Sequence, residues 1–480
     1  MTQLEQFRQE VYDQYLNCAD ASMDLLDALT ANTTARSVVE LSLNAPFRRN
    51  YGSVYTAINS FFQPDPLQEA TTERRTYNQK LTRILAPYLP IPDQRPFWLF
   101  GLDVTPAPRP FARTLADRSF VYQPNTIWGN KPIAIGHQYA SLALLPEKVG
   151  PKAPPWIVPL STRRVDSTKS GTQVGVEQVA DVFLDATLPF AKNLCVQVGD
   201  GAYSQVSFLG PISQLHLNHL VTIARLRSNR TLYRPAPEVE KIPKRRGRRP
   251  WYGEPFKLKD ETTWDPPDEE EELSYITPRG RSYRVQIQAW QNLLMRGTRE
   301  YDMHQQPFTI IRCTVFNEKG EQVFQRPLWL LILGKRREEL SLIEIWQAYR
   351  QRYDLEHFFR FGKQRLLMNI YQTPDVEREE NWWQIVQLAY LQLWLARSLA
   401  QSLPRPWERS LPHPNPDTAT PAATQRDFGR IIRQIGTPAK HPKPRGKSPG
   451  RASGQRQRPR IRHPVIKKGT QKPIKAQLAA

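Results

Sequence analysis

Four residues whose side chains suit phosphate chemistry recur at helical spacing late in the sequence. They are Tyr349, Arg352, Glu356 and Lys363. At about 100° per residue counted from Tyr349, they fall near 0°, 300°, 340° and 320°, on one face roughly 60° wide. A carboxylate flanked by Arg and Lys can bind a cation while the two bases hold phosphate oxygens. The alternative is a solvated face with ion pairs, which is the common role of a charged helix face.

Two aspartates each follow an apolar run that predicts a buried strand. Asp103 ends the run FWLFGLD, and Asp200 ends LCVQVGD, where Gly201 would allow a close turn. Carboxylates at the ends of neighbouring strands converge on one crevice. With Glu356 they supply hard oxygen ligands, which suit two Mg²⁺ ions about 3.5 to 4 Å apart. The rivals for the second acid, Asp166 and Asp185, do not follow a continuous apolar strand.

The spacing of the four helix residues resembles the YREK signature of DDE transposases of the IS4 type. The signature follows both aspartates and a β-rich insertion, and KRRGRRPWYGEPFKL is similar to the insertion of the IS701-like branch. The resemblance covers residues 96–402 and implies an RNase H-like fold that binds two Mg²⁺ or Mn²⁺ ions. It places the catalytic and metal-binding roles on Asp103, Asp200 and Glu356, and DNA contacts on Tyr349, Arg352 and Lys363.

The resemblance also implies a function and partners. Such a transposase cleaves insertion-sequence ends with water and joins the freed 3′ hydroxyl ends to target DNA. Its partners are double-stranded DNA, at the terminal inverted repeats and at the target, and a second copy of the chain in a DNA-bound homodimer. Two alternatives stay open: a domesticated, non-catalytic DNA-binding protein, and an RNase H-like nuclease that does not join strands.

Tryptophan has a possible role in the excision route of the IS4 type. There, excision can pass through a hairpin in which a flipped base stacks on a tryptophan. Trp251, Trp290 and Trp329 all lie in the insertion. The sequence does not choose among them, and each could equally serve packing.

The sequence pattern around these residues predicts an α/β protein in five segments. The segments are a helical N-terminal DNA-binding region (1–92), the first part of an RNase H-like core (93–226), a mainly β insertion (227–336), the second part of the core (337–403) and a Pro-rich, basic, disordered tail (404–480). The N-terminal helices could hold DNA or serve packing alone.

Periodicity predicts the individual elements of the core. Helices are expected at Gln173–Leu188, from Ser341 with a capping box to Glu344, and at Glu379–Ser402. Strands are expected at Ser119–Tyr122, Gly136–Leu145, Leu194–Val198, Leu220–Leu226, Ser282–Ala289, Phe308–Phe316 and Pro327–Leu333.

The net charge of +21 is concentrated in the tail. Fifteen Lys and Arg and no acidic residue follow Asp427, which leaves +6 for the rest of the chain. A solvated basic tail binds polyanions without sequence preference, although it could also serve solubility alone. Inside the insertion, the basic cluster at 244–249 and the acidic run at 268–272 could face water or each other.

The sequence favours a cytoplasmic, nucleoid-associated protein of prokaryotic type. No apolar run approaches the roughly 18 to 20 residues of a membrane span, and the amino terminus lacks the order of a signal peptide. Cys18, Cys195 and Cys313 form no CxxC pair, so neither disulfides nor structural zinc is expected. We expect the pair His216 and His219 to be structural.

Overall fold

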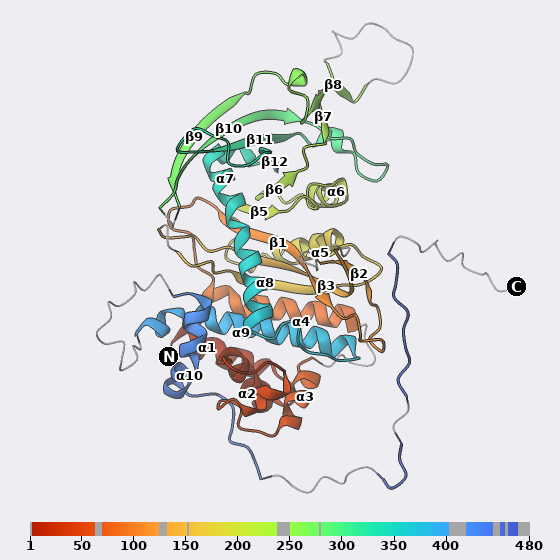
Figure 1. Cartoon of the computed structure of the whole chain (residues 1–480), viewed down its shortest axis with the longest axis vertical. Coiled ribbons are helices and arrows are strands. Elements are labelled where there is room, and N and C mark those ends of the chain that lie inside the picture. The colour runs from red at the N-terminus through yellow and green to blue at the C-terminus, as the bar shows by residue number, and fades with distance from the viewer. Residues whose placement is uncertain are drawn as a thin grey trace, which may run out of the picture.

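A mixed β-sheet crosses the middle of the molecule and carries the two aspartates (Figure 1). The computed structural model describes residues 2–62, 70–123, 132–150, 153–237, 250–277, 280–402, 419–444, 452–456 and 459–468. The predicted α/β class is confirmed. The basic cluster at 244–249 and, in the Pro-rich tail, residues 404–418, 445–451, 457–458 and 469–480 lie outside the described residues.

Within those residues the large sheet has ten strands, in the order β2-β3-β1-β5-β6-β12-β11-β10-β9, with β4 also paired to β3. The bounds are β1 (Trp98–Pro108), β2 (Ser119–Tyr122), β3 (Ile133–Leu144), β4 (Val158–Val165), β5 (Cys195–Gly199), β6 (Leu220–Leu226), β9 (Glu269–Ile276), β10 (Ser282–Leu293), β11 (Phe308–Asn317) and β12 (Leu328–Leu333). A separate pair is formed by β7 (Thr231–Pro235) and β8 (Tyr252–Lys257).

The three central strands run parallel, and their sequences show why they are central. β5 is buried at all five residues, and β6 at all but Arg225. Near-continuous apolar runs suit strands that are covered on both faces. Parallel neighbours need crossover connections, and α6 (Val206–Gln214) supplies the one between β5 and β6.

The insertion continues the core sheet. β12 pairs antiparallel with β6, with Leu331 opposite Ala224, and β11, β10 and β9 follow outward. The predicted strands of the insertion are confirmed. The acidic run was not expected to be a strand, yet it forms the sheet edge in β9. Its carboxylates bond to polar side chains of β10, as in the hydrogen bond from Arg284 to Glu272. β9 is therefore paired with β10 on one side and presents a charged edge on the other.

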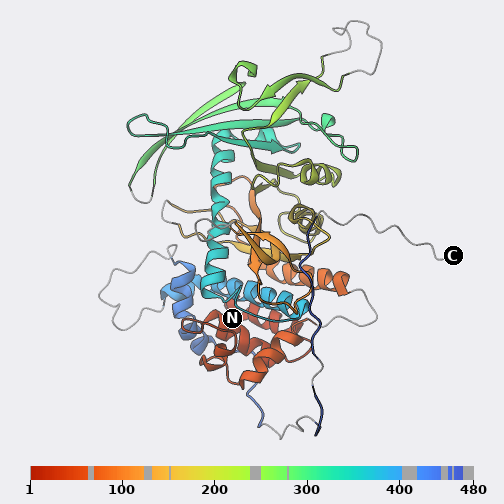
Figure 2. The ribbon, with the colours of Figure 1, turned by 45° about the vertical axis from the view of Figure 1, so that its right-hand side comes forward.

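Helices cover the sheet and form a layer at one end of it (Figures 1 and 2). Their bounds are α1 (Gln3–Gln14), α2 (Ala19–Thr30), α3 (Tyr51–Ser60), α4 (Ala70–Leu85), α5 (Gly171–Phe183), α7 (Leu342–Gln351), α8 (Tyr353–Arg365), α9 (Val376–Ser402) and α10 (Pro421–Ile435). Short 3₁₀ turns lie at Val39–Leu43, Ala86–Tyr88, Glu261–Thr263, Met303–Gln305 and Arg337–Glu339. No helix in the described ranges is long and apolar enough to cross a membrane.

α9 is the central helix of that layer. It contacts β4 on one side and α1, α2, α3 and α10 on the other, and residues 381–396 are buried without interruption. A helix that is buried all round belongs to the interior, so α9 is a core helix of this layer. Arg8 of α1 reinforces this packing, because its buried guanidinium pairs with Asp27 of α2 and donates to Gln392 of α9 at 2.7 Å.

The prediction of a disordered tail from residue 404 is wrong for α10. This helix has the N-cap Thr420, and its apolar face, with Phe428, Ile431 and Ile432, is buried against the N-terminal helices and α9. A strong amphipathic pattern therefore recruits part of the basic tail into the fold. The basic residues of α10 lie mostly on the opposite, partly exposed face.

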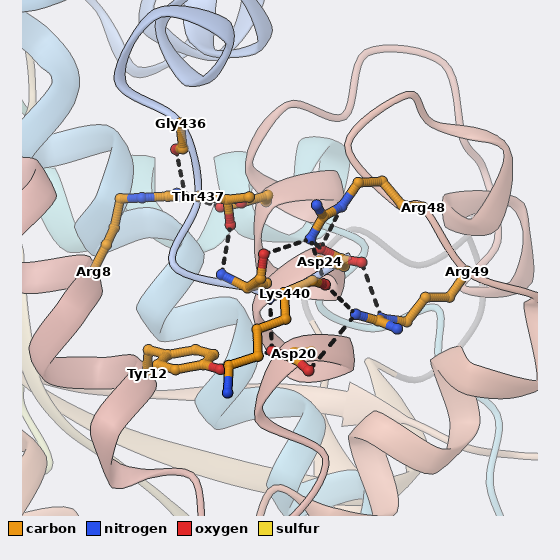
Figure 3. Close-up of polar contacts among 11 residues, drawn as sticks. Arg8, Tyr12, Asp20, Asp24, Arg48, Arg49, Gly436, Thr437 and Lys440 are labelled. Atoms are coloured by element: carbon orange, nitrogen blue, oxygen red, sulfur yellow. Dashed lines mark hydrogen bonds and ion pairs between the residues drawn. The ribbon is translucent and has the colours of Figure 1, made fainter. Parts of the chain in front are cut away.

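The segment after α10 is held by arginines of the N-terminal region (Figure 3). The amide of Lys440 donates to Asp20 at 2.9 Å, and its carbonyl accepts from Arg49 at 2.8 Å. Arg48 donates to the carbonyl of Ala439 at 3.1 Å. Arg48 and Arg49 lie in the N-terminal region (1–92) that was predicted to bind DNA, and both are engaged within the protein.

Candidate active site

Asp103 and Asp200 lie side by side at the centre of the sheet. β1 and β5 pair in parallel up to Leu102 opposite Gly199, so the two aspartates are the next residues in register. Asp200 follows the end of β5, as predicted. The prediction that Asp103 ends its strand is wrong, because β3 stays paired with β1 and extends it to Pro108.

Strand alternation on β1 selects which side chains meet α8. Gly101, Asp103 and Thr105 lie two residues apart and therefore point to one face of the sheet. All three contact or approach α8, whereas Leu102 and Val104 between them pack toward α5. The two-residue alternation of the strand thus places Asp103 on the face of the sheet that α8 covers.

Gly101 allows α8 to lie close to the sheet. A Cβ at this position would be 2.6 Å from Cδ1 of Leu355 and 3.3 Å from Leu145. Leu355, Phe359 and Leu366 are buried and form an apolar stripe that anchors the helix. Close packing at this point holds Glu356, the next residue after Leu355, above the aspartates.

The glycine that the turn at Asp200 requires is Gly199 and not Gly201. A Cβ on Gly199 would be 2.7 Å from the ring of Tyr203, which is buried directly behind the turn. A Cβ on Gly201 would have only an ordinary contact, at 3.7 Å from the carbonyl oxygen of Arg225. The close approach therefore lies one residue before the acid.

The predicted charged helix is formed by two consecutive helices. Ser341 caps α7 with the expected capping box to Glu344. The helix is interrupted at Arg352, whose amide bonds to the carbonyl three residues back, that of Tyr349, at 3.2 Å. Arg352 keeps right-handed helical angles, and α7 and α8 continue in the same direction (Figure 1). All four residues of the signature therefore still line one cleft.

Arg352 joins two of the three acids. Its guanidinium is 3.3 Å from Oδ2 of Asp103 and 3.0 Å from Oε1 of Glu356. Burial raises the pKa of Asp103 to about 6, which the Arg352 charge opposes and the neighbouring Asp200 reinforces. The site thus holds adjacent carboxylates whose negative charge is only partly compensated.

Lys363 and Tyr349 complete the signature at the two ends of this helix face. Nζ of Lys363 donates to Oγ1 of Thr105 at 2.6 Å, and burial lowers the pKa of this lysine to about 8 although Asp103 counteracts the shift. Tyr349 is buried, which raises the pKa of its hydroxyl, while the Arg352 charge lowers it. Both side chains line the same cleft as the acids.

A cleft of about 1420 Å³ contains all six candidate residues. Its described lining has three acidic residues, which are Asp103, Asp200 and Glu356, and seven Lys or Arg residues. The five cations outside the signature are Arg225, Arg227, Lys259, Arg326 and Arg360. A cleft with carboxylates at the sheet and an excess of positive charge around them favours a polyanion.

Sequence reasoning missed most of this positive lining. Arg225 and Arg227 carried a signal, because they lie at and just after the end of β6, at the same sheet edge as Asp200. Lys259 and Arg326 carried none, since they come from distant loops of the insertion that only the fold brings to the cleft. Among the described residues, no ion pair of these four side chains is present.

The donor set fits a divalent cation in part. Asp103 and Asp200 are adjacent hard oxygen donors, and the raised pKa of Asp103 reflects a desolvated site in which a cation would be stabilised. Glu356 is held by Arg352, and the described residues contain no group of three Asp, Glu, His or Cys already gathered for a metal. Assembly of a three-carboxylate site requires Arg352 to exchange its partner.

The rival aspartates lie elsewhere. Asp166 accepts bonds from the amides of Thr168 and Lys169, and Asp185 pairs with Arg83, and neither lines the cleft. The geometry therefore agrees with Asp200 as the partner of Asp103.

The three tryptophans of the insertion also differ. Trp290 and Trp329 are buried in an aromatic cluster with Phe256, which leaves them no free ring face for a base. Trp251 is 39% exposed and stacks on His304 with ring centroids 4.3 Å apart.

Comparison with known families gives one match. The model of a family described as "DDE superfamily endonuclease" matches residues 14–297, which is more than half of the chain. The matched region includes Asp103 and Asp200 and ends before Glu356. No curated protein is significantly similar to the chain.

Proposed function

The chain belongs to the DDE superfamily of endonucleases, and on this basis we propose that it is a transposase of the IS4 type with a YREK signature on an RNase H-like fold. It cleaves DNA at the ends of an insertion sequence and joins the 3′ hydroxyl ends to target DNA. The observation that carries the proposal is the convergence of Asp103, Asp200 and the four signature residues on one positively charged cleft.

Asp103, Asp200 and Glu356 are the residues that would hold two divalent ions, Mg²⁺ or Mn²⁺. When bound, the ions supply Lewis-acid stabilisation of the attacking and leaving oxygens of the phosphodiester. The hard oxygen donors and the desolvation of Asp103 support this assignment. Asp103 and Glu356, which now pair with Arg352, would then have cations as partners in its place.

Arg352 is the residue that changes partner in this proposal. Its guanidinium presents a fork of donors that matches phosphate oxygens as well as carboxylates. Once the carboxylates have cations of their own, Arg352 is free to hold the scissile phosphate. Lys363 and Tyr349, about three turns and one turn away on the same face, contact the neighbouring backbone.

The reaction comprises two displacements at phosphorus. In the first, a water oxygen bonds to phosphorus and the 3′ oxygen of the element end leaves. In the second, that 3′ hydroxyl oxygen bonds to a phosphorus of the target, and the target strand's own 3′ oxygen leaves. The same cleft serves both steps, since each needs one phosphodiester positioned between carboxylates and cations.

The remaining cations of the cleft support duplex DNA as the substrate. Arg225 and Arg227 come from the end of β6, and Lys259 and Arg326 come from the insertion. Their side chains are exposed and form no ion pair within the described part of the chain, which suits phosphates along a backbone. A homodimer would bring two such clefts to the two inverted-repeat ends, and a nucleoid-associated location would follow from the DNA affinity.

Activity on cognate end DNA tests the proposal. With Mg²⁺, the chain should nick a duplex that carries the flanking inverted repeat and transfer a pre-cut 3′ end into plasmid DNA. Asp200→Ala and Glu356→Ala should each abolish both activities, whereas Asp185→Ala, an acid outside the cleft, should retain them. Retained activity in either cleft variant would refute the site.

The same assays separate the alternatives. A nuclease that never joins strands would nick DNA and fail to transfer the pre-cut 3′ end. A domesticated DNA-binding protein would bind the ends and do neither. The intact set of acids, whose negative charge Arg352 compensates only in part, favours catalysis over binding alone.

A further inference from the structure

The basic C-terminal segment lies against the edge of the catalytic sheet over residues 459–468 (Figures 1 and 2). The amide of His463 donates to the carbonyl of Arg113 at 2.9 Å, and the amide of Ile466 donates to that of Arg118 at 2.8 Å. Ile466 also forms a parallel bridge with Ser119, the first residue of β2. We call residues 459–468 the C-terminal strap.

The strap completes the surroundings of a buried arginine. The side chain of Arg118 is 3% exposed, and it donates to the carbonyls of Leu115, Arg109 and Pro110, and to that of His463 at 3.3 Å. A buried cation without a complete set of acceptors is strongly destabilising. One of its four acceptors belongs to the strap, so the guanidinium has all of these hydrogen bonds only when the strap is bound.

Two further contacts hold the ends of the strap. Arg460 pairs with Asp375 before α9 at 3.1 Å. Nζ of Lys468 donates to the carbonyls of Asp166 and Lys169, in the turn between β4 and α5, at 2.9 and 3.0 Å. The strap is therefore anchored at both ends and in the middle by groups from three separate parts of the core, which are the loop before β2, the turn after β4 and the segment before α9.

We propose that the loop before β2, together with Ser119 at the start of β2, is an acceptor site for an extended basic strand, occupied by the chain's own residues 459–468. β2 lies at the end of the sheet order, and an open edge binds a strand through main-chain hydrogen bonds. The charge of the site suits a basic occupant, because Asp375 and the carbonyls at Asp166 and Lys169 receive its cations.

β2 connects this site to the catalytic cleft. Tyr122 and Gln123, at the end of β2, line the cleft that holds Asp103. The strap bridges Ser119, the first residue of the strand whose last residue, Tyr122, lines that cleft. The strap is therefore a part of the basic tail with a structural role.

Hydrogen exchange in the full chain tests the site without any DNA. The amides of His463 and Ile466 should exchange at least about tenfold more slowly than those of Ile461 and Arg462, because only the first two donate to the core. Equal exchange of the four amides would overturn the proposal. Protection that increases with protein concentration would overturn the intramolecular assignment and place the strap on a second copy.

Two proline variants provide a matched pair. Ile466→Pro removes the amide that bonds to Arg118, whereas Ile461→Pro changes a residue that is 76% exposed. The first should abolish protection of His463 and accelerate exchange in residues 118–123 several-fold, and the second should do neither. Identical behaviour of the two variants would refute the docking.

Binding in trans separates strand recognition from charge. A fluorescent peptide of residues 456–468 should bind saturably, one to one, to a chain that ends at residue 456, and not to a chain that ends at residue 468. A scrambled peptide of the same composition should bind at least about tenfold more weakly, since it keeps the charge and loses the register. Equal binding of both peptides would show charge attraction alone and overturn the proposal.

Discussion

Replacement of Gly101 by alanine tests how closely α8 must approach the sheet. The new Cβ would be 2.6 Å from Cδ1 of Leu355, a separation that real side chains do not tolerate, and 3.3 Å from Leu145. Overpacking of a buried site typically costs about 1 to 3 kcal/mol. Alanine is favoured over glycine within a strand by about 0.5 to 1 kcal/mol, which offsets part of that cost. We therefore expect a net loss of about 1 to 2 kcal/mol in the free energy of unfolding.

Urea unfolding of four proteins measures this effect: the native chain, Gly101→Ala, Leu355→Ala and the double variant. Leu355→Ala alone should cost about 2 to 5 kcal/mol, because it opens a cavity at a fully buried site. The alanine at 101 should partly fill that cavity, so the two losses should be non-additive by at least about 1 kcal/mol.

Gly52→Ala is the control, because nothing lies within 4 Å of a Cβ at this position in α3, and it should be neutral or stabilising. Strand cleavage by Gly101→Ala should fall about 100-fold, since Glu356 follows the displaced Leu355. Additive losses in the unfolding cycle would refute the close contact between α8 and β1.

Three further outcomes follow from the charges of the cleft. Arg352→Gln should raise the pKa of Asp103 further above its ordinary value, because it removes the charge that opposes the effect of burial. Carboxyl-carbon NMR of labelled aspartate measures this pKa, and an unchanged value would contradict the expectation. The affinity for Mn²⁺ should fall about tenfold for each pH unit below pH 6, because the raised pKa keeps Asp103 protonated below that pH. Titration calorimetry at pH 5 and pH 7.5 measures both affinities, and equal values would contradict the expectation. Lys259→Ala with Arg326→Ala should reduce the slope of log affinity for DNA against log salt by up to about 0.9 per lost contact, whereas Lys319→Ala, an exposed lysine outside the cleft, should leave the slope unchanged.

The basic tail shows how structure changes an experiment designed from sequence. Removal of residues 428–480 would be a natural test of DNA affinity, but the cut falls inside α10 and deletes the buried Phe428, Ile431 and Ile432. The loss of packing would then be confused with the loss of charge. A chain that ends at residue 468 keeps α10 and the C-terminal strap and removes only the last residues.

Local elements with strong periodicity could be predicted from the sequence. The buried runs of β5 and β6, the capping box at Ser341 and the apolar stripe through Leu355 were all visible, because each depends on residues close together in the chain. β9 was not visible: its four consecutive glutamates suggest a solvated loop, and only cross-strand partners such as Arg284 make them a strand. α10 was overlooked because the composition of the tail obscured its amphipathic pattern.

The sequence by itself determined which side chains could carry out the proposed chemistry, since residue type and helical spacing are local properties. It placed Tyr349, Arg352, Glu356 and Lys363 on one face before any fold was known. Only the tertiary structure decided that Asp103 lies beside Asp200, because that depends on the register between β1 and β5, residues almost a hundred positions apart. The same holds for the bridge that Arg352 forms between two acids and for the cations of the insertion at the cleft. Long-range pairing and burial set these distances, and neither is encoded in the spacing of neighbouring residues.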